Sequence, residues 1–293
     1  MKLIFIGFGE AGYNIAAGLT EAGLKDIGAF DANANDPKKG GLIQTRAKEL
    51  GVKLFATVEE ACKDCDFVFS LTSAKVAVAV AKNALPFMHK GQVYIDMNSA
   101  APTVEEEIDK LPRPEGVMFC DAGVMGTVPG NRHKVPMFLS GDGAETFAKA
   151  FTQFGMKLTV LKTPAGSSSA IKMFKSVVMK GLPQLMFESF EAASKYGVLD
   201  ILIGSLKGSL EGKSIEKLAD TFIARTLIHS ARRSAEMQDV VKTLEILQVD
   251  ASMSKATVGK LNTMAAKDWA TLLGEGGSKL KYKEAMDKYL QLK

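Results

Sequence analysis

The chain has 293 residues, of which 46% are hydrophobic and 24% are charged, and 37 basic against 33 acidic residues leave a net charge of +4. This composition is typical of a globular protein long enough for two domains, and so small a basic excess excludes a nucleic-acid-binding footprint. No apolar run approaches the roughly 18 residues that a membrane span needs, so we expect a cytoplasmic protein without membrane partners.

Residues 1–163 alternate short apolar strands with amphipathic helical stretches. Strands are predicted at 2–6, 27–30, 53–55, 67–70, 93–95, 117–120, 137–140 and 157–161, and helices at 11–22, 74–84 and 144–154. Short buried strands that alternate with helices are typical of a mostly parallel sheet with helices on both faces. We therefore predict an α/β domain over residues 1–163.

A glycine-rich turn follows the first predicted strand directly. Its residues are Gly7, Phe8, Gly9, Glu10, Ala11 and Gly12. The first glycine permits a tight turn, the second lets the backbone approach a pyrophosphate, and the third lets the following helix pack closely. Free N–H groups at the helix N-terminus then bind phosphate oxygens. This strand–turn–helix context predicts a Rossmann domain that binds a dinucleotide.

Asp31 ends the second predicted strand, about twenty residues after the glycines. A carboxylate at this position accepts hydrogen bonds from the ribose hydroxyls and repels a 2′-phosphate, which favours NAD over NADP. No basic residue lies among the next six residues, although Lys38 and Lys39 follow them. We expect NAD as the preferred cofactor.

Cys62 and Cys65 form a C-x-x-C pair, and Cys120 is the third cysteine of the chain. A redox pair needs its first thiol at an exposed helix N-terminus, whereas this pair is predicted to end a short helix. No second Cys or His pair accompanies it. We therefore expect packing residues in a reducing compartment, and no metal site.

Small polar turns follow two further predicted strands. Leu71, Thr72 and Ser73 come after the strand at 67–70, and Asn98 follows the strand at 93–95. Ligands of doubly wound sheets bind beyond the carboxyl ends of the strands, so these residues are candidates for the nicotinamide side. Ser, Thr and Asn are also ordinary turn and cap residues, and both interpretations remain open.

After residue 163 the pattern becomes helical. A long helix is predicted at 166–196, apolar nearly all round, with Pro183 expected to kink it; further helices are predicted at 214–228, 232–247, 252–270 and 279–292. A helix with apolar residues all round is expected to be buried. We predict an all-helical domain over residues 164–293, with the active site in the cleft between the domains.

Lys172 lies early in this long helix among apolar neighbours. Burial would lower the pKa of its ammonium and make it a proton acceptor near neutral pH, and Lys175 on the same face would act in the same direction. The alternative is that both lysines lie on a solvent-facing stripe.

Four motifs together resemble the β-hydroxyacid dehydrogenase superfamily, which includes 3-hydroxyisobutyrate and 6-phosphogluconate dehydrogenases. They are the turn Gly7–Gly12, the stretch 96–102 (DMNSAAP), the stretch 121–127 (DAGVMGT) and the stretch 166–172 (GSSSAIK). The resemblance implies that Lys172 is the catalytic general acid or base. It also implies that Met125, Gly126 and Thr127 belong to a loop that binds a carboxylate-bearing substrate.

The chain also departs from the family pattern. Lys175 and Ser176 stand where the family has Asn or His followed by Asn, Met125 replaces a serine, and Thr127 replaces a glycine. The family's K-D-L is replaced around residues 235–237. Lys175, Ser176 and Arg233 are candidate substrate residues, and His229 and Arg232 are further candidate anion partners. The set of changes indicates a divergent bacterial branch related to the phosphogluconate enzymes.

The resemblance implies hydride transfer between NAD(P) and a small hydroxy acid. Two alternatives stay open: an imine or ketimine reductase of the same superfamily, which retention of Lys172 disfavours, and a dinucleotide-binding protein without catalysis. The family is usually dimeric or tetrameric, so we expect a homodimer or a higher homo-oligomer.

Overall fold

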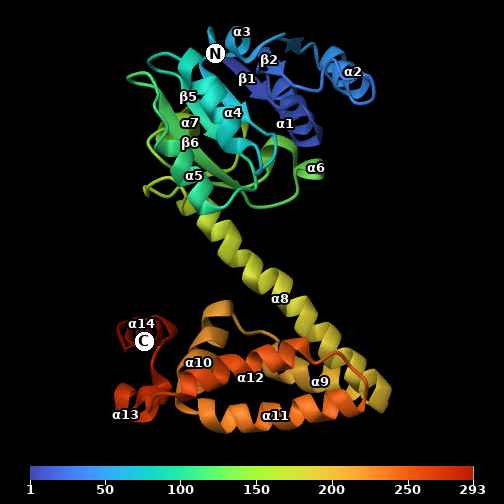
Figure 1. Cartoon of the computed structure of the whole chain (residues 1–293), viewed down its shortest axis with the longest axis vertical. Coiled ribbons are helices and arrows are strands. Elements are labelled where there is room, and N and C mark those ends of the chain that lie inside the picture. The colour runs from blue at the N-terminus through green and yellow to red at the C-terminus, as the bar shows by residue number, and fades with distance from the viewer. Residues whose placement is uncertain (293) are drawn as a thin grey trace. The chain divides into compact units, whose positions relative to one another are not determined.

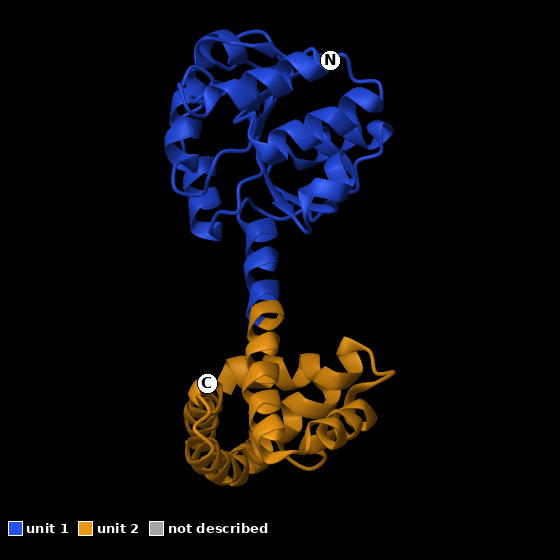
Figure 2. Cartoon of the chain, turned by 90° about the vertical axis from the view of Figure 1, so that its right-hand side faces the viewer, with its two compact units in different colours: residues 1–177 blue, residues 178–293 orange. Residues whose placement is uncertain are grey.

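The computed structural model describes residues 1–292, and the chain divides into two compact units, residues 1–177 and 178–293 (Figure 2). Unit 1 contains an eight-stranded sheet in the order β3-β2-β1-β4-β5-β6-β7-β8. All neighbouring strands are parallel except the pair β6 and β7. The strands are β1 (Lys2–Ile6), β2 (Asp26–Phe30), β3 (Lys53–Leu54), β4 (Phe67–Ser70), β5 (Val93–Asp96), β6 (Met118–Val124), β7 (Met137–Ser140) and β8 (Leu158–Val160) (Figure 1).

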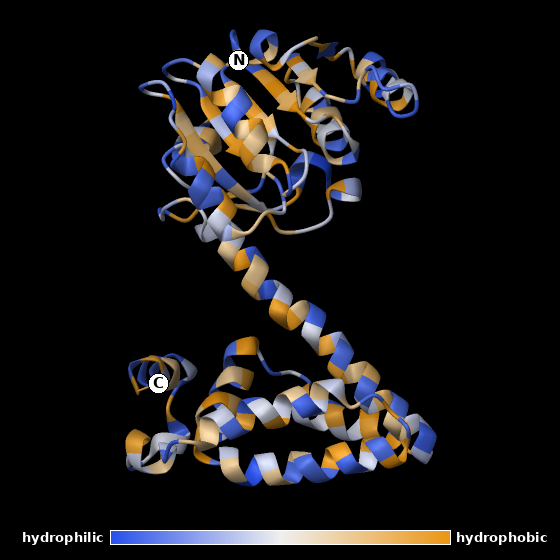
Figure 3. Ribbon diagram, in the orientation of Figure 1, coloured by the Kyte–Doolittle hydropathy of each residue, from blue (hydrophilic) through white to orange (hydrophobic). Residues whose placement is uncertain are grey.

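Two hydrophobic clusters show that helices cover both faces of the sheet. On one face Phe5 and Phe69 pack with α1 (Glu10–Glu21), α2 (Gly40–Leu50) and α7 (Ala144–Phe151). On the other face Ile4 and Val68 pack with α3 (Val58–Cys62), α4 (Ala77–Ala84) and α5 (Pro102–Asp109). Since successive side chains of a strand point to opposite faces, the hydrophobic strands in Figure 3 supply both clusters. The predicted doubly wound, mostly parallel sheet is confirmed.

Unit 2 is entirely helical within the residues that the structure describes. Helix α8 (Ser167–Tyr196) begins in unit 1 and continues into unit 2 with Pro183 inside it. It is followed by α9 (Leu199–Leu210), α10 (Ile215–Ile228), α11 (Ser230–Ile246), α12 (Ser252–Ala265), α13 (Trp269–Leu273) and α14 (Tyr282–Leu292). The Glu188 carboxylate accepts from the N–H groups of Met253 (2.8 Å) and Ser254 (2.9 Å), which caps α12.

Several predicted boundaries differ from the structure. The expected helix at 252–270 is two helices, because Asp268 caps a new one and accepts from the N–H of Thr271. Helix α9 was missed, since the glycines within its apolar sequence obscure the helical period. The units divide after Val177 rather than after residue 163, because the start of α8 is hydrogen-bonded to Asp121 in the sheet.

The expectation that α8 is buried in a helical domain is wrong for the single chain. Apolar side chains along it are exposed, including Phe174 (68%), Val177 (73%) and Phe187 (72%). Its apolar character therefore does not come from packing inside one chain. No helix within residues 1–292 combines the length and the apolar character needed to cross a membrane.

Candidate functional site

The glycine turn between β1 and α1 has the geometry of a phosphate-binding loop. Gly7 adopts a φ of 93°, and a Cβ atom there would lie 2.4 Å from the carbonyl oxygen of Leu71. A Cβ atom at Gly12 would lie 2.6 Å from the carbonyl oxygen of Gly7, so this glycine allows close packing. At Gly9 a Cβ atom would meet nothing within 4 Å, and no side chain caps α1. The uncapped N–H groups and the open space beside Gly9 fit a pyrophosphate.

Replacing Gly9 with alanine is therefore expected to weaken NAD(H) binding while leaving the fold intact. The added methyl group would occupy the space that a pyrophosphate needs, and we expect at least about a tenfold rise in Kd, or about 1.4 kcal/mol. Gly41→Ala is the matched control, because a Cβ there also meets nothing within 4 Å but lies on α2. Fluorescence titration measures Kd and thermal unfolding checks the fold. An unchanged Kd in Gly9→Ala would contradict the assignment of this loop.

Asp31 follows β2 and joins it to the glycine turn. Its Oδ2 accepts from the N–H of Phe8 (2.7 Å), and its Oδ1 accepts from the N–H of Asn33 (2.8 Å). Because each carboxylate oxygen has further acceptor capacity, Asp31 could still accept hydrogen bonds from ribose hydroxyls. The structure thus places its charge directly beside the turn.

Asn98 connects the loops that follow β4 and β5. Its Oδ1 accepts from the N–H of Thr72 (2.8 Å), and its Nδ2 donates to Ser70 Oγ (3.1 Å) and Asp96 Oδ2 (2.9 Å). Both amide hydrogens are therefore used inside the protein, which indicates that Asn98 holds these loops in place. Leu71 is partly buried, whereas Thr72 and Ser73 are exposed at this edge.

Asp121 on β6 fixes the start of α8, a role that sequence reasoning missed. This carboxylate is 1% exposed and accepts four hydrogen bonds. The donors are the N–H groups of Gly166 (3.0 Å) and Ser169 (3.2 Å) and the hydroxyls of Ser140 (3.1 Å) and Ser169 (2.8 Å). A carboxylate at a helix N-terminus is stabilised by the helix dipole. Asp121 therefore sets the position of the helix that carries Lys172.

Lys172 lies on the second turn of α8 and contacts the loop after β5. Its Nζ donates to Ser99 Oγ (2.7 Å). Burial lowers the pKa of Lys172 below its usual value, while the negative charges of Asp121 and Glu105 act in the opposite direction. Burial thus shifts the pKa of Lys172 in the predicted direction. The charges that affect this pKa differ from the expectation, because Lys175 is exposed and is not one of them.

A chain of contacts within unit 1 connects the glycine turn with this lysine. Gly7 lies against Leu71, Thr72 is bonded to Asn98, and Ser99 accepts the hydrogen bond from Lys172. The residues predicted to bind the cofactor and the lysine predicted to act in catalysis therefore lie at one edge of the sheet, at the carboxyl ends of its strands. Such an edge is where ligands of doubly wound sheets bind.

Asp96, which opens the motif at 96–102, and Glu105 on α5 are two further buried carboxyls, and neither was singled out as a site residue. Burial raises the pKa of Asp96 to about 6, against the effect of its hydrogen bonds with Asn98. Burial, together with the charges of Asp96 and Asp121, raises the pKa of Glu105 to about 10. Perturbed acids of this kind cluster at functional sites.

The predicted substrate residues have different surroundings. Met125 follows β6 and its N–H donates to the carbonyl of Pro136 (2.8 Å), while Gly126 and Thr127 are exposed. The Ser176 hydroxyl donates to the carbonyl of Lys172 in its own helix (3.1 Å). Arg233 belongs to unit 2, where its Nη1 donates to Thr226 Oγ1 (2.5 Å).

Cys62 and Cys65 are buried free thiols. Burial raises the pKa of Cys62 to about 12 and also raises that of Cys65. Gln92 Nε2 donates to both of their carbonyls, at 2.9 and 2.6 Å. These thiols lack the exposure and low pKa of a reactive pair. Within residues 1–292 no group of acidic, His or Cys side chains could hold a metal ion.

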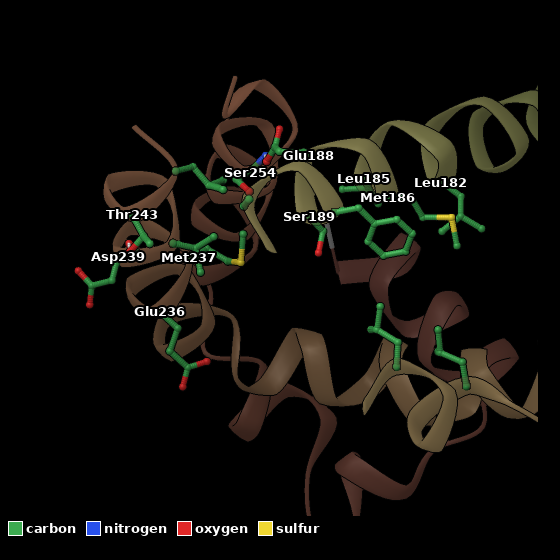
Figure 4. Close-up of a pocket in the computed structure, with 16 residues that line it drawn as sticks. Leu182, Leu185, Met186, Glu188, Ser189, Glu236, Met237, Asp239, Thr243 and Ser254 are labelled. Atoms are coloured by element: carbon green, nitrogen blue, oxygen red, sulfur yellow. Dashed lines mark hydrogen bonds between the residues drawn. The ribbon is translucent and has the colours of Figure 1, made fainter. Parts of the chain in front are cut away.

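A cavity with a volume of about 670 Å³ lies in unit 2 (Figure 4). Most of its lining is apolar and comes from α8, α9 and α11, including Leu182, Leu185, Met186 and Val240. None of the predicted cofactor or substrate residues lines it among the residues that the structure describes. It is an apolar groove continuous with exposed residues of α8.

Comparison with protein families identifies both parts of the chain. The model for the NAD binding domain of 6-phosphogluconate dehydrogenase matches residues 2–161, and a domain of unknown function, DUF1932, matches residues 193–264. An uncharacterised 28.5 kDa protein of Methanothermus fervidus is 30% identical over 88% of this chain and 96% of its own length. The mitochondrial 3-hydroxyisobutyrate dehydrogenase of Drosophila melanogaster is 30% identical over 47% of this chain and 40% of its own.

Solved structures agree with the fold. A conserved hypothetical protein from Sinorhizobium meliloti has a TM-score of 0.65 at 30% identity, covering 99% of this chain and 96% of its own. An imine reductase variant from Myxococcus stipitatus in complex with NAD⁺ has a TM-score of 0.74 at 14% identity, covering 98% and 99%. At 14% identity, the similarity to the imine reductase shows a shared fold and nothing more.

Proposed function

Because this chain belongs to the superfamily of NAD(P)-binding 3-hydroxyacid and 6-phosphogluconate dehydrogenase-like proteins, we propose that it transfers a hydride between a nicotinamide cofactor and a small hydroxy acid. The observation that supports this most directly is the position of Lys172, at the same sheet edge as the glycine turn and hydrogen-bonded to Ser99. When bound, the nicotinamide supplies the hydride chemistry.

Lys172 is the general base or acid in this proposal. As a free amine it takes the proton from the substrate hydroxyl during oxidation, and as an ammonium it gives a proton to the carbonyl oxygen during reduction. A pKa lowered by burial keeps both forms accessible nearer to neutral pH than for an exposed lysine. Ser99 orients the amine through its hydroxyl.

The substrate carboxylate is assigned to the loop after β6. The exposed backbone at Gly126 and Thr127 can offer N–H groups to an anion, and Met125 shapes the same loop. Lys175, which is exposed, and Arg233 are proposed as further anion partners. The hydroxyl of Ser176 is used within its helix and can also accept from a ligand.

NAD is the proposed cofactor in preference to NADP. The Asp31 carboxylate beside the glycine turn would repel a 2′-phosphate and accept from ribose hydroxyls. Comparison of the Kd values for NADH and NADPH tests this preference. Tighter binding of NADPH would contradict it.

The deciding assay measures oxidation of the reduced cofactor with a panel of keto acids, each tested alone and together with an amine. The proposal expects turnover with a keto acid alone. Turnover only when the amine is present identifies an imine reductase. This is the second candidate function, and it is tested because the chain shares its fold with an imine reductase. Tight cofactor binding without any turnover identifies a non-catalytic binding protein.

We also propose that the chain forms a homodimer or a higher homo-oligomer through α8. An apolar stripe with helical spacing is exposed along it, formed by Ile171, Phe174, Val178, Leu182 and Leu185. Leu182 and Leu185 also line the apolar groove, so stripe and groove form one surface. Soluble proteins rarely expose so large an apolar surface, and a second copy offers the same surface for symmetric pairing.

Light scattering is expected to give at least twice the monomer mass of 31.4 kDa. Val178→Glu places a charge in the stripe and should reduce this mass to that of the monomer, since an unpaired charge is costly in an interface. Ile246→Glu is the control, because Ile246 is an even more exposed apolar residue (81% against 60% for Val178) and lies at the end of α11. A monomeric mass for the unaltered chain would contradict the proposal.

A further inference from the structure

His133 is the only buried residue among residues 125–134, which form most of the loop between β6 and β7. It lies in the short 3₁₀ helix η2 (Arg132–Lys134) and is 4% exposed. Its Nε2 lies 3.0 Å from the carbonyl oxygen of Phe154 in η3 (Thr152–Phe154). Because a carbonyl oxygen can only accept, Nε2 carries a proton, and in the neutral ring Nδ1 is the unprotonated nitrogen.

The Nδ1 atom of this ring faces the backbone of α1. It is buried and has no hydrogen-bond partner among residues 1–292. A Cβ atom at Gly18 would lie 2.0 Å from Nδ1, so the ring fits only because α1 has a glycine at this position. The carbonyl oxygen of Gly18 already accepts from the N–H of Ala22 (3.0 Å) within the helix. A second proton on the ring would therefore bury a charged N–H group without an acceptor, which is costly.

The charged groups around His133 come from η2 and from α1. Burial lowers the pKa of His133, and the positive charges of Lys134 and Arg132 act in the same direction. The hydrogen bond from Nε2 and the negative charge of Glu21 on α1 raise this pKa, but Glu21 forms an ion pair with Arg132. Neither η3 nor α6 (Val128–Asn131) contains a titratable side chain. The surroundings therefore favour the neutral ring.

The loop 125–136 is the one to which the substrate carboxylate is assigned above. Its two ends are joined by the hydrogen bond from the N–H of Met125 to the carbonyl of Pro136 (2.8 Å). A Cβ atom at Gly126 would lie 3.4 Å from Cγ2 of Val135, so Gly126 packs on the segment that follows the buried histidine. The contact of this histidine with α1 thus holds a part of the loop that the pairing of β6 with β7 does not reach.

We propose that neutral His133 is a positioning residue that holds the loop 125–136 against α1, and that a proton on Nδ1 releases this loop. The inference rests on the proposed function only for the binding of a substrate by the loop. The contact between the loop and the cofactor helix does not depend on catalysis.

The loop is therefore held at neutral pH and released as the pH falls. Once the ring is in water, His133 has its ordinary pKa of about 6.5. Because the held state binds this proton less tightly, the ratio of held to released loop falls by up to about tenfold for each pH unit below that value. Acidification thus withdraws the support of Gly126.

Hydrogen exchange of the full chain at about pH 7.5 and about pH 5.5 tests the proposal. After correction for the intrinsic pH dependence of exchange, protection of the amides in the loop 125–136 is expected to fall by about tenfold at the lower pH. His133→Gln, which cannot take up a proton, should remove this pH dependence, and His89→Gln, at an exposed histidine, should retain it. Equal protection of the loop at both pH values, or an unchanged pH dependence in His133→Gln, would overturn the proposal.

A second measurement does not depend on how His133→Gln folds. The chain has three histidines, so the imidazole NMR signals lost in His89→Gln and in His229→Gln identify that of His133 in the unaltered protein. Its pKa is expected below about 6.5, with Nδ1 as the unprotonated nitrogen of the neutral ring. An ordinary or raised pKa, or the other tautomer, would also overturn the proposal. Neither readout requires turnover, so failure of the proposed function remains distinguishable.

Discussion

Replacing Lys172 with methionine is expected to lower kcat by at least about 100-fold, in both directions of the reaction. Methionine keeps most of the length and the apolar character of the side-chain stem but cannot bind or release a proton. The hydrogen bond from Nζ to Ser99 is lost, but the residues of the glycine turn are not altered. The Kd for the cofactor should therefore remain within about twofold of its original value, because the loss concerns the transition state and not binding of the cofactor.

Steady-state rates and cofactor titration measure these two quantities for the keto acid that the panel identifies. Lys149→Met is the matched control, because Lys149 is an exposed lysine on α7. A kcat within about tenfold of the original value would exclude Lys172 as the general acid or base. An equal loss in the control variant would point to a general effect of removing lysines.

Replacing Asp121 with asparagine is expected to reduce the free energy of unfolding of unit 1 by about 3–5 kcal/mol. The carboxylate accepts hydrogen bonds from the N–H groups of Gly166 and Ser169 through Oδ2 and from the Ser169 hydroxyl through Oδ1. An asparagine NH₂ in the place of Oδ2 would face these N–H donors with another donor, and in the place of Oδ1 it would force the Ser169 hydroxyl to act as an acceptor. It would also remove the negative charge at the start of α8, where the helix dipole favours it.

Denaturant unfolding measures the change. Asp64→Asn is the control, since this aspartate pairs with Lys2 on the surface and its side chain is 94% exposed, and an exposed pair contributes at most about 1 kcal/mol. A loss for Asp121→Asn no larger than that of the control would show that the anchor of α8 is not energetically important. The position of Lys172 would then need another explanation.

Local signals explain why the cofactor half was predicted well. The glycines, the apolar strand before them and Asp31 after them lie within about thirty residues, so a short stretch of sequence contains the whole pattern. Short continuous apolar strands and helices with period 3.6 also show in short windows. The mostly parallel sheet and the helical second part were therefore predictable without a structure.

The surroundings of Lys172 were not predictable in the same way. Glu105 stands in a run of three glutamates, a pattern that is typical of a solvated helix face, and only its spacing of three residues from the buried Ile108 indicated an inward position. Asp121 meets its donors 19 to 48 residues further along the chain. A local sequence pattern shows neither that Glu105 is buried nor which distant residues donate hydrogen bonds to Asp121.

By itself the sequence determined the class of fold, the dinucleotide turn and the identity of the catalytic lysine candidate, because each depends on residues that are neighbours in the chain. Only the tertiary structure decided which charges act on Lys172, how α8 is anchored and that the apolar surface of α8 is exposed. The physical reason is that burial and Coulomb interactions depend on distances across the folded molecule.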